Sequence, residues 1–237
     1  ASPLKSKNGA TIDSKFITLY REHYLEIKTN SPKSSLKPGW YPDALIPLIN
    51  PYTGEPLKGG RFSAMPFDVE PMKNQPIWVE VYVPPVASSG VYEGVITISP
   101  LNLKLNYTLT VWNFKLPDKP SLRSNFGSFG SRIAKSHKAE PNTDLYRLLE
   151  YRYSEALAQH RLSPLIPSYL MPQVKSDGSI AIDDKTINEL KKWMNEFHIT
   201  GFPLRLIGSD PTGKDRERST RYLRQMYDFL KTNGWEK

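Results

Sequence analysis

The fold class is decided by the segment Gln75-Pro-Ile-Trp-Val-Glu-Val-Tyr-Val-Pro-Pro-Val-Ala-Ser-Ser-Gly-Val-Tyr-Glu-Gly-Val-Ile-Thr-Ile98. Between residues 77 and 83, Ile and Val alternate with Trp, Glu and Tyr, which is the period of a half-buried strand. Pro84 and Pro85 end this strand because proline has no backbone N–H to donate. After Ser88-Ser89-Gly90, a second β-branched run over 91–98 would fold back on the first. The segment therefore predicts a β-hairpin in one wall of a β-sandwich.

Other parts of the first half fit the same sandwich. Further strands are predicted over residues 16–27 and 103–111. The interval 31–76 is rich in Pro and Gly, yet it is too aromatic for a disordered linker, so we interpret it as ordered loops packed over the sandwich. We expect Trp78 and Tyr82 to pack under this interval or against the following domain.

The second half of the chain has a different order of predicted strands and helices. Prolines in the segment 114–120 predict a boundary between a β-sandwich domain, residues 1–119, and a second domain, residues 120–237. Extended segments alternate here with three predicted helices, the last over about 219–232. The extended segments are an apolar run over 121–129 and strands over 165–171 and 202–207. This alternation is typical of the opening of a parallel barrel or open sheet. The expected buried stripes are Leu145, Leu148, Leu149, Ala156 and Leu157 in the first helix, Ile187, Leu190, Met194 and Phe197 in the second, and Tyr222, Leu223, Met226, Phe229 and Leu230 in the third.

Three blocks carry a resemblance to a known family. They are Gly39-Trp-Tyr-Pro-Asp-Ala-Leu-Ile-Pro-Leu48, the segment 75–98, and Leu109-Thr-Val-Trp-Asn-Phe-Lys-Leu-Pro117, and in this order they resemble the glycoside hydrolase 123-like proteins. The resemblance implies a multidomain β plus α/β chain, in which an antiparallel β-sandwich precedes a (β/α)8 TIM-like barrel. At 237 residues the chain has room for the sandwich and about half of a barrel, which usually needs ~250 residues. We therefore expect the first three βα units of an incomplete barrel.

The resemblance also implies a mechanism. In the family an adjacent Asp-Glu pair on a later barrel strand orients the substrate's own acetamido group and protonates the leaving oxygen. Such chemistry needs two carboxylates in different environments. No Asp-Glu dipeptide occurs in this sequence, so we expect no catalytic residue here and no activity of the chain alone.

Part of a substrate rim is still expected. Barrel sites are built from the loops after the strands, here 129–138, 169–174 and 208–214. Tyr169 is a candidate for stacking on a sugar, and Arg132 and Asp210 are candidates for hydrogen bonds to hydroxyls. Each has a structural alternative: Tyr169 as core packing, Arg132 as a surface charge, and Asp210 as a turn residue before Pro211.

Other classes of site are less well supported. The segment Gly208-Ser-Asp-Pro-Thr-Gly-Lys-Asp215 nearly matches a phosphate-binding loop, but its last position is a carboxylate where the pattern has a hydroxyl. The four histidines lack metal-ligand spacing and cysteine is absent, so we expect neither a metal nor a cofactor. His160 and Arg161 fall at a predicted helix end, where they would complement the helix dipole.

The net charge of +8 raises the possibility of nucleic-acid binding. The densest basic cluster, Lys214, Arg216, Arg218, Arg221 and Arg224, is interrupted by acidic residues. It fits a solvated helix face better than a stripe that follows phosphates, so nucleic-acid binding is not favoured.

The sequence thus predicts a carbohydrate-active protein, a fragment of a glycoside hydrolase acting on N-acetylated hexosaminides. The alternative is a non-catalytic glycan-binding or structural protein. The expected partners are a glycan and either the missing remainder of the barrel or a second copy of the chain. No apolar run is long enough to cross a membrane, and the composition fits an exported protein, extracellular or periplasmic.

Overall fold

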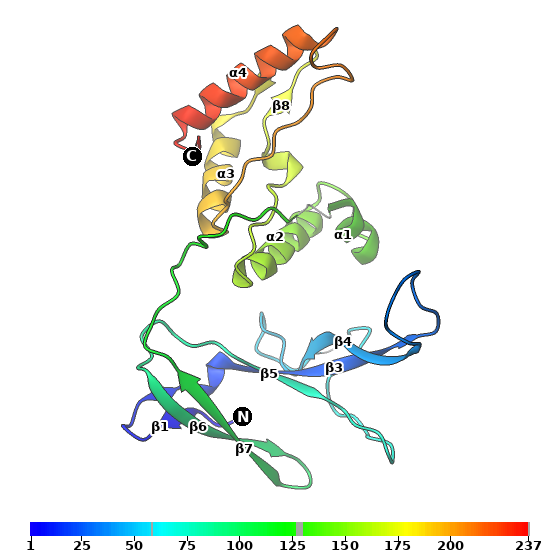
Figure 1. Ribbon diagram of the computed structural model, residues 1–237, viewed down its shortest axis with the longest axis vertical. Helices are drawn as coiled ribbons and strands as arrows, with labels where there is room; N and C mark the ends of the chain where they lie inside the picture. Colours follow the sequence, from blue (N-terminus) through cyan, green and yellow to red (C-terminus); the bar gives the residue numbers. More distant parts are fainter. Residues whose placement is uncertain (58, 127–129, 237) are drawn as a thin grey trace. The chain divides into compact units, whose positions relative to one another are not determined.

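A computed structural model describes residues 1–57, 59–126 and 130–236 as antiparallel β-sheets followed by four α-helices (Figure 1). The chain divides into two compact units, Ala1–Leu116 and Pro117–Lys237. Phe129, the first residue of one predicted rim loop and the last of the predicted apolar run 121–129, lies outside the described residues.

The first unit contains two antiparallel sheets. One has the strand order β2-β1-β6-β7 and the other the order β4-β3-β5. The strands are β1 (Leu4–Ser6), β2 (Thr11–Ile12), β3 (Ile17–Ile27), β4 (Gly39–Pro47), β5 (Ile77–Val81), β6 (Gly90–Ile98) and β7 (Leu103–Val111), with a short 3-10 helix η1 (Ser14–Phe16) before β3.

The predicted hairpin between residues 77–83 and 91–98 is wrong, although both strands exist. β5 pairs with β3, whereas β6 pairs with β7 in the other sheet. Pro84 and Pro85 lie shortly after β5, beyond Tyr82 and Val83, and cannot donate to a ladder between β5 and β6. The short connection 99–102 instead gives β6 a close partner in β7.

The prediction that residues 31–76 are only loops is also wrong. Residues 39–47 form β4, which pairs with β3 along an irregular register beside His23 and Tyr24. β4 carries Pro42 and Pro47 because it lies at the edge of its sheet, where one row of backbone groups needs no partner strand.

The core of this unit joins its two sheets at one end. Leu4, Ile12 and Tyr92 are buried, and Ile17 and Val81 from the second sheet pack against them. Trp78 and Tyr82 are not buried with this core: they are 50% and 58% exposed. The expectation that the interval 31–76 covers them is therefore wrong.

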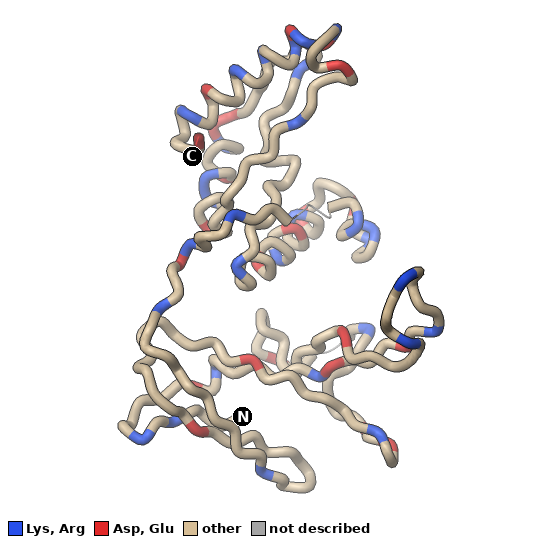
Figure 2. Tube along the Cα trace, viewed as in Figure 1, with Lys and Arg blue, Asp and Glu red and all other residues tan. Residues whose placement is uncertain are grey.

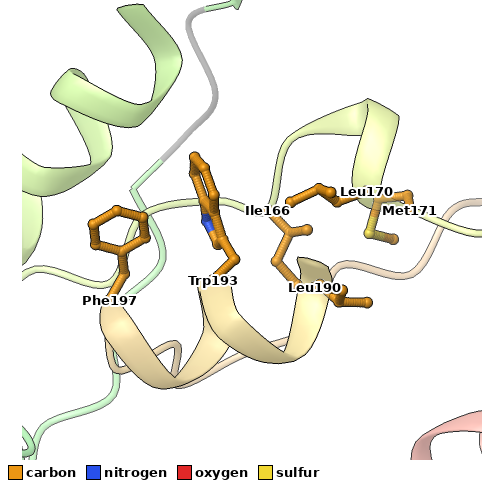
Figure 3. Packing of buried hydrophobic residues seen from close by; sticks show 6 residues of the cluster. All are labelled: Ile166, Leu170, Met171, Leu190, Trp193 and Phe197. Carbon is orange, nitrogen blue, oxygen red and sulfur yellow. The ribbon is translucent and has the colours of Figure 1, made fainter. Parts of the chain in front are cut away.

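The second unit is mainly helical. Its elements are α1 (Gly130–His137), α2 (Asp144–Gln159), the 3-10 helix η2 (Ser168–Leu170), the antiparallel pair β8 (Gln173–Val174) and β9 (Ile180–Ala181), α3 (Asp184–Glu196) and α4 (Arg216–Thr232). A core cluster made by α3 and the segment around η2 contains Ile166, Leu170, Met171, Leu190, Trp193 and Phe197 (Figure 3).

Two predicted strands are absent from the described residues. In place of a strand over 165–171, Pro167 precedes the turn η2, and residues 202–207, which include Pro203, form no ladder. A strand needs a hydrogen-bonded neighbour, and proline cannot donate to one. Helix α1 was not predicted, because it is short and its buried side chains are only Ile133 and Ala134, too few to give an apolar pattern in the sequence. The described residues show no barrel.

A ring of hydroxyl contacts ties three segments of this unit together. The Ser163 N–H donates to Ser124 Oγ at 2.8 Å, and the Thr200 N–H donates to Ser163 Oγ at 3.0 Å. Thr200 Oγ1 closes the ring by accepting from the Ser124 N–H at 3.2 Å and donating to the Ser124 carbonyl at 2.9 Å. Phe126 and Pro164 form a parallel bridge beside this ring. These contacts hold the three segments next to one another.

The three predicted helices are confirmed, with one wrong stripe. Thr143 caps α2 and Asp183 caps α3 through side-chain oxygens that accept backbone N–H groups. In α2 the buried residues are Tyr146, Glu150 and Ser154, whereas Leu145 and Leu148 are about half exposed. In α3 and α4 most of the expected stripe is buried or half-buried, with Leu223 exposed.

Candidate functional site

Tyr169 is the predicted rim residue with the most developed surroundings. It lies in η2 and packs against the cluster of Ala134, Ala139 and Tyr146, which come from α1, the connection after it and α2. The Arg147 guanidinium stands 5.0 Å from the centre of the Tyr169 ring, a cation–π distance. Burial raises the pKa of Tyr169 to about 12, and the nearby Glu150 carboxylate adds to this effect. One face of the ring is thus covered by Arg147, so a ligand at this point would meet a cation as well as an aromatic edge.

Glu150 lies beside Tyr169 and is a buried carboxyl group, 6% exposed. The Tyr146 hydroxyl donates to its Oε1 at 2.8 Å, while Oε2 has no hydrogen-bond partner among the described residues. Burial raises the pKa of Glu150, and the Tyr146 hydrogen bond opposes this shift only in part. Burial therefore disfavours the charged form of Glu150.

Tyr146, Arg147, Glu150 and Tyr169 form the candidate site. Together they offer a buried acid, two phenols and a guanidinium, which are groups that orient hydroxyl-rich ligands. Sequence reasoning missed Glu150 because the leucines of α2 dominated the apolar pattern. The usable signal was the four-residue spacing of Tyr146, Glu150 and Ser154, which places them on one helix face.

The other two predicted rim residues lie on different elements. Arg132 is at an exposed position of α1. Asp210 folds back on its own loop, where Oδ1 accepts from the Gly213 N–H at 2.9 Å and Oδ2 from the Lys214 N–H at 3.3 Å. Asp210 thus has the turn-forming role that the sequence offered as its alternative. The sugar contacts proposed for Arg132, Tyr169 and Asp210 stay predictions.

The hydrogen bonds of Asp210 also show how the loop 208–215, which resembles a phosphate-binding loop, uses its backbone N–H groups. In such loops backbone N–H groups cradle the phosphate. Here the Gly213 and Lys214 N–H groups already donate to Asp210, and the Asp210 N–H donates to Asp215 Oδ2 at 3.1 Å. Two carboxylates therefore hold the donors that an anion would need.

The basic cluster near α4 is also engaged locally. Arg221 pairs with Asp177 at 2.8 Å, and Arg218 lies 3.5 Å from Asp215. Figure 2 shows blue and red segments interspersed along this helix. At the end of α2, the His160 ring contacts the Ala156 carbonyl at 2.7 Å, as expected for a side chain at a helix C-terminus. These contacts fit a solvated surface.

The part of the chain that the structure describes contains no group of three or more potential metal ligands, and none of its helices is long and apolar enough to cross a bilayer. A hollow of about 550 Å³ lies between α3 and α4, lined by both acidic and basic residues, among them Asp184, Lys191 and Asp228. Its mixed charge indicates no particular ligand.

Comparison with known proteins confirms the resemblance seen in the sequence. Residues 1–100 match the family model of the glycoside hydrolase 123 N-terminal domain. The fold is similar to that of a family 123 glycoside hydrolase from Clostridium perfringens, solved in a study of glycolipid glycan hydrolysis, with a TM-score of 0.61 and 15% sequence identity. The match covers 99% of this chain and 46% of that chain, so this chain spans less than half the length of that enzyme. No curated protein matches the sequence.

Proposed function

We propose that residues 1–237 are the N-terminal part of a glycan-hydrolysing protein of the glycoside hydrolase 123 kind. The observation that carries this proposal is the combination of two matches. The first 100 residues fit the N-terminal domain model of that family, and nearly the whole chain aligns with the fold of a family member. On this proposal the antiparallel sheets belong to a β-sandwich, and the second unit opens a (β/α)8 barrel.

Several contacts of the second unit support the barrel proposal. The parallel bridge between Phe126 and Pro164 and the hydroxyl ring at Ser124, Ser163 and Thr200 bring three successive segments together. The first of these segments is followed by α1 and α2, the second by α3 and the third by α4. This is the order of the first three βα units of a parallel barrel.

The proposed activity of the whole protein is hydrolysis of a glycosidic bond next to an N-acetylated hexosamine. Residues 1–237 would contribute ligand contacts, Tyr169 and Arg147 among them, but not the adjacent Asp-Glu pair, which is absent from the sequence. The proposal includes a glycan ligand and a location outside the cytoplasm, extracellular or periplasmic.

The alternative is a protein that binds glycans or a partner without hydrolysing anything. It is favoured by the many exposed aromatic side chains of the first unit, including Trp40, Trp78 and Trp112. Such side chains are common at interaction surfaces.

One experiment separates the two functions. The product of the complete reading frame that encodes residues 1–237 is assayed on aryl N-acetylhexosaminides, with residues 1–237 alone as the comparison. Release of the aryl group by the complete product supports the hydrolase. A complete product that binds an N-acetylhexosamine oligomer but releases no aryl group would establish the alternative.

A further inference from the structure

One face of the sheet β4-β3-β5 combines aromatic rings with carboxylates. Side chains at alternate positions of a strand share a face, and directly paired residues on neighbouring strands do so too. In β3 this places Tyr20, Glu22, Tyr24 and Glu26 together, and the Tyr24 hydroxyl donates to Asn74 Oδ1 at 2.9 Å. Trp78 lies opposite Tyr20 on β5, and Trp40 lies opposite Glu26 on β4. The aromatic–acidic face is defined by Tyr20, Glu22, Tyr24, Glu26, Trp40, Trp78 and Glu80.

The surroundings of Tyr20 support this assignment of faces. Glu80 pairs with Thr18, next to Tyr20 along the same face. Burial, followed by the neighbouring Glu80 carboxylate, raises the pKa of Tyr20. Tyr20 and Glu80 therefore lie together on one side of the sheet.

The opposite face of the sheet is covered by the chain itself. Arg21 lies 4.8 Å from the centre of the Phe67 ring, and its Nη1 donates to the Ser63 carbonyl at 3.2 Å. His23 stacks on Phe62 with ring centres 4.0 Å apart. Since residues 21 and 23 alternate with 20 and 22, the segment 62–67 covers the face opposite to the aromatic–acidic one. Trp78 and Trp40 stay 50% and 63% exposed.

The mixture of groups indicates what this face binds. Glu is depleted at the centres of protein interfaces, and burying several carboxylates under a protein surface is costly. A glycan differs, because its hydroxyls can donate to each carboxylate while its apolar ring faces cover the aromatic rings. The distance from Tyr20 to Glu26 along β3 is about 20 Å, at ~3.4 Å per residue, so several sugar rings fit.

The charge of the face limits the kind of glycan. Glu22, Glu26 and Glu80 make it acidic within a chain of net charge +8, and red segments mark this sheet in Figure 2. Lys28 pairs with Glu26 at 3.6 Å, at one end of the face. Sulfated or sialylated chains would meet repulsion there, whereas neutral chains would not.

We propose that the aromatic–acidic face of the sheet β4-β3-β5 is a binding site for neutral glycans, separate from the residues around Tyr169. The proposal rests on the proposed function only for its choice of glycans as the ligand class. It adds a second contact region, in the first unit, that would hold a glycan independently of any hydrolysis.

The test measures binding of a neutral N-acetylglucosamine hexamer to residues 1–237 by calorimetric titration. Trp78→Ala and Trp40→Ala are each expected to weaken binding by about tenfold or more, because each removes a stacking ring. The matched control is Trp112→Ala, since Trp112 is 70% exposed but lies outside this sheet; its affinity should stay within about twofold of the wild type. A heparin-derived hexasaccharide is expected not to compete. Thermal melts of all variants show that they remain folded.

Several results would overturn the proposal. The proposal is refuted if the wild type fails to bind the hexamer, or if Trp78→Ala and Trp40→Ala bind it as tightly as the wild type. It is also refuted if Trp112→Ala loses as much affinity as Trp78→Ala, or if the heparin fragment competes with the hexamer. Loss of binding in Tyr169→Ala alone would move the site to η2 and leave the proposed hydrolase function intact. A change of oligomeric state in Trp78→Ala without a change in glycan binding would make the face a protein interface. The hydrolysis assay on the complete product does not depend on any of these results.

Discussion

Replacing Glu150 by glutamine is expected to stabilise the protein at pH 8 and to change little at pH 4. In the wild type the ionised carboxylate has one hydrogen bond, from Tyr146 at 2.8 Å, and a buried Oε2 without a partner among the described residues. Glutamine keeps an oxygen to accept from Tyr146 and removes the buried charge. An unpaired buried charged group costs more than an unpaired neutral one, so the expected gain at pH 8 is about 1–2 kcal/mol.

The sign of the pH dependence follows from the pKa of Glu150. Burial raises this pKa in the folded state above the ordinary value of 4.5. At pH values between 4.5 and the folded-state pKa, the folded state therefore binds more protons than the unfolded state. The stability that comes from the neutral acid is fully present below about pH 4.5 and is lost as the pH rises through the folded-state pKa. The glutamine variant lacks this titration, so its advantage should grow over the same range.

Urea unfolding of the wild type and Glu150→Gln at several pH values between 4 and 8 checks this prediction. The control is Glu140→Gln, because Glu140 is exposed just before α2. That variant should follow the wild type at every pH. An advantage of Glu150→Gln that does not vary with pH, or a loss of stability at pH 8, would refute the assignment of Glu150 as a buried acid.

Four further outcomes are expected. Trp193→Ala should lower the free energy of unfolding by about 3–5 kcal/mol, because Trp193 is buried beside Phe197 (Figure 3) and its ring also contacts Tyr151; a cost below about 1 kcal/mol in urea melts would contradict that packing. Trp78→Ala should cost only about 1 kcal/mol by the same measurement, since half of the ring is already exposed. Residues 1–237 should release aryl groups from N-acetylhexosaminides no faster than buffer, and release that disappears in Asp210→Asn would show the reverse. The chain should also associate at micromolar concentration, because Leu145, Leu148 and other large apolar side chains are exposed; a monodisperse monomer by light scattering would count against this.

The elements that sequence predicted well are those with strong local signals. The three predicted helices exist, and Thr143 and Asp183 cap two of them through hydrogen bonds to backbone groups only a few residues away. The four strands expected in the first half also exist, since alternation of apolar residues is a local property. The family resemblance depended on short blocks of this kind, and it is confirmed over residues 1–100.

Strand pairing was harder to predict because partners are chosen over long distances. The segment 77–98 contains two real strands, but β5 pairs with β3, some sixty residues earlier in the chain, as the partners Tyr20 and Trp78 show. The strands predicted over 165–171 and 202–207 did not form, for a related reason. Their apolar composition is suitable, but a strand forms only where a neighbour satisfies its backbone, and Pro167 and Pro203 weaken that pairing.

The candidate sites show a similar division. Tyr169 was proposed from its place at the end of a predicted strand that the structure does not form, and its sugar contact stays a prediction. Glu150 was hidden among the leucines of α2 and became visible only through its burial. Trp78 was expected to be covered, because alternation reveals that two faces of a strand differ but not which one the rest of the chain covers. The contacts of Arg21 with Phe67 and of His23 with Phe62 decide that question. They place the covering segment on the face away from Trp78, and the ring left exposed beside carboxylates becomes a reason to look for a ligand there.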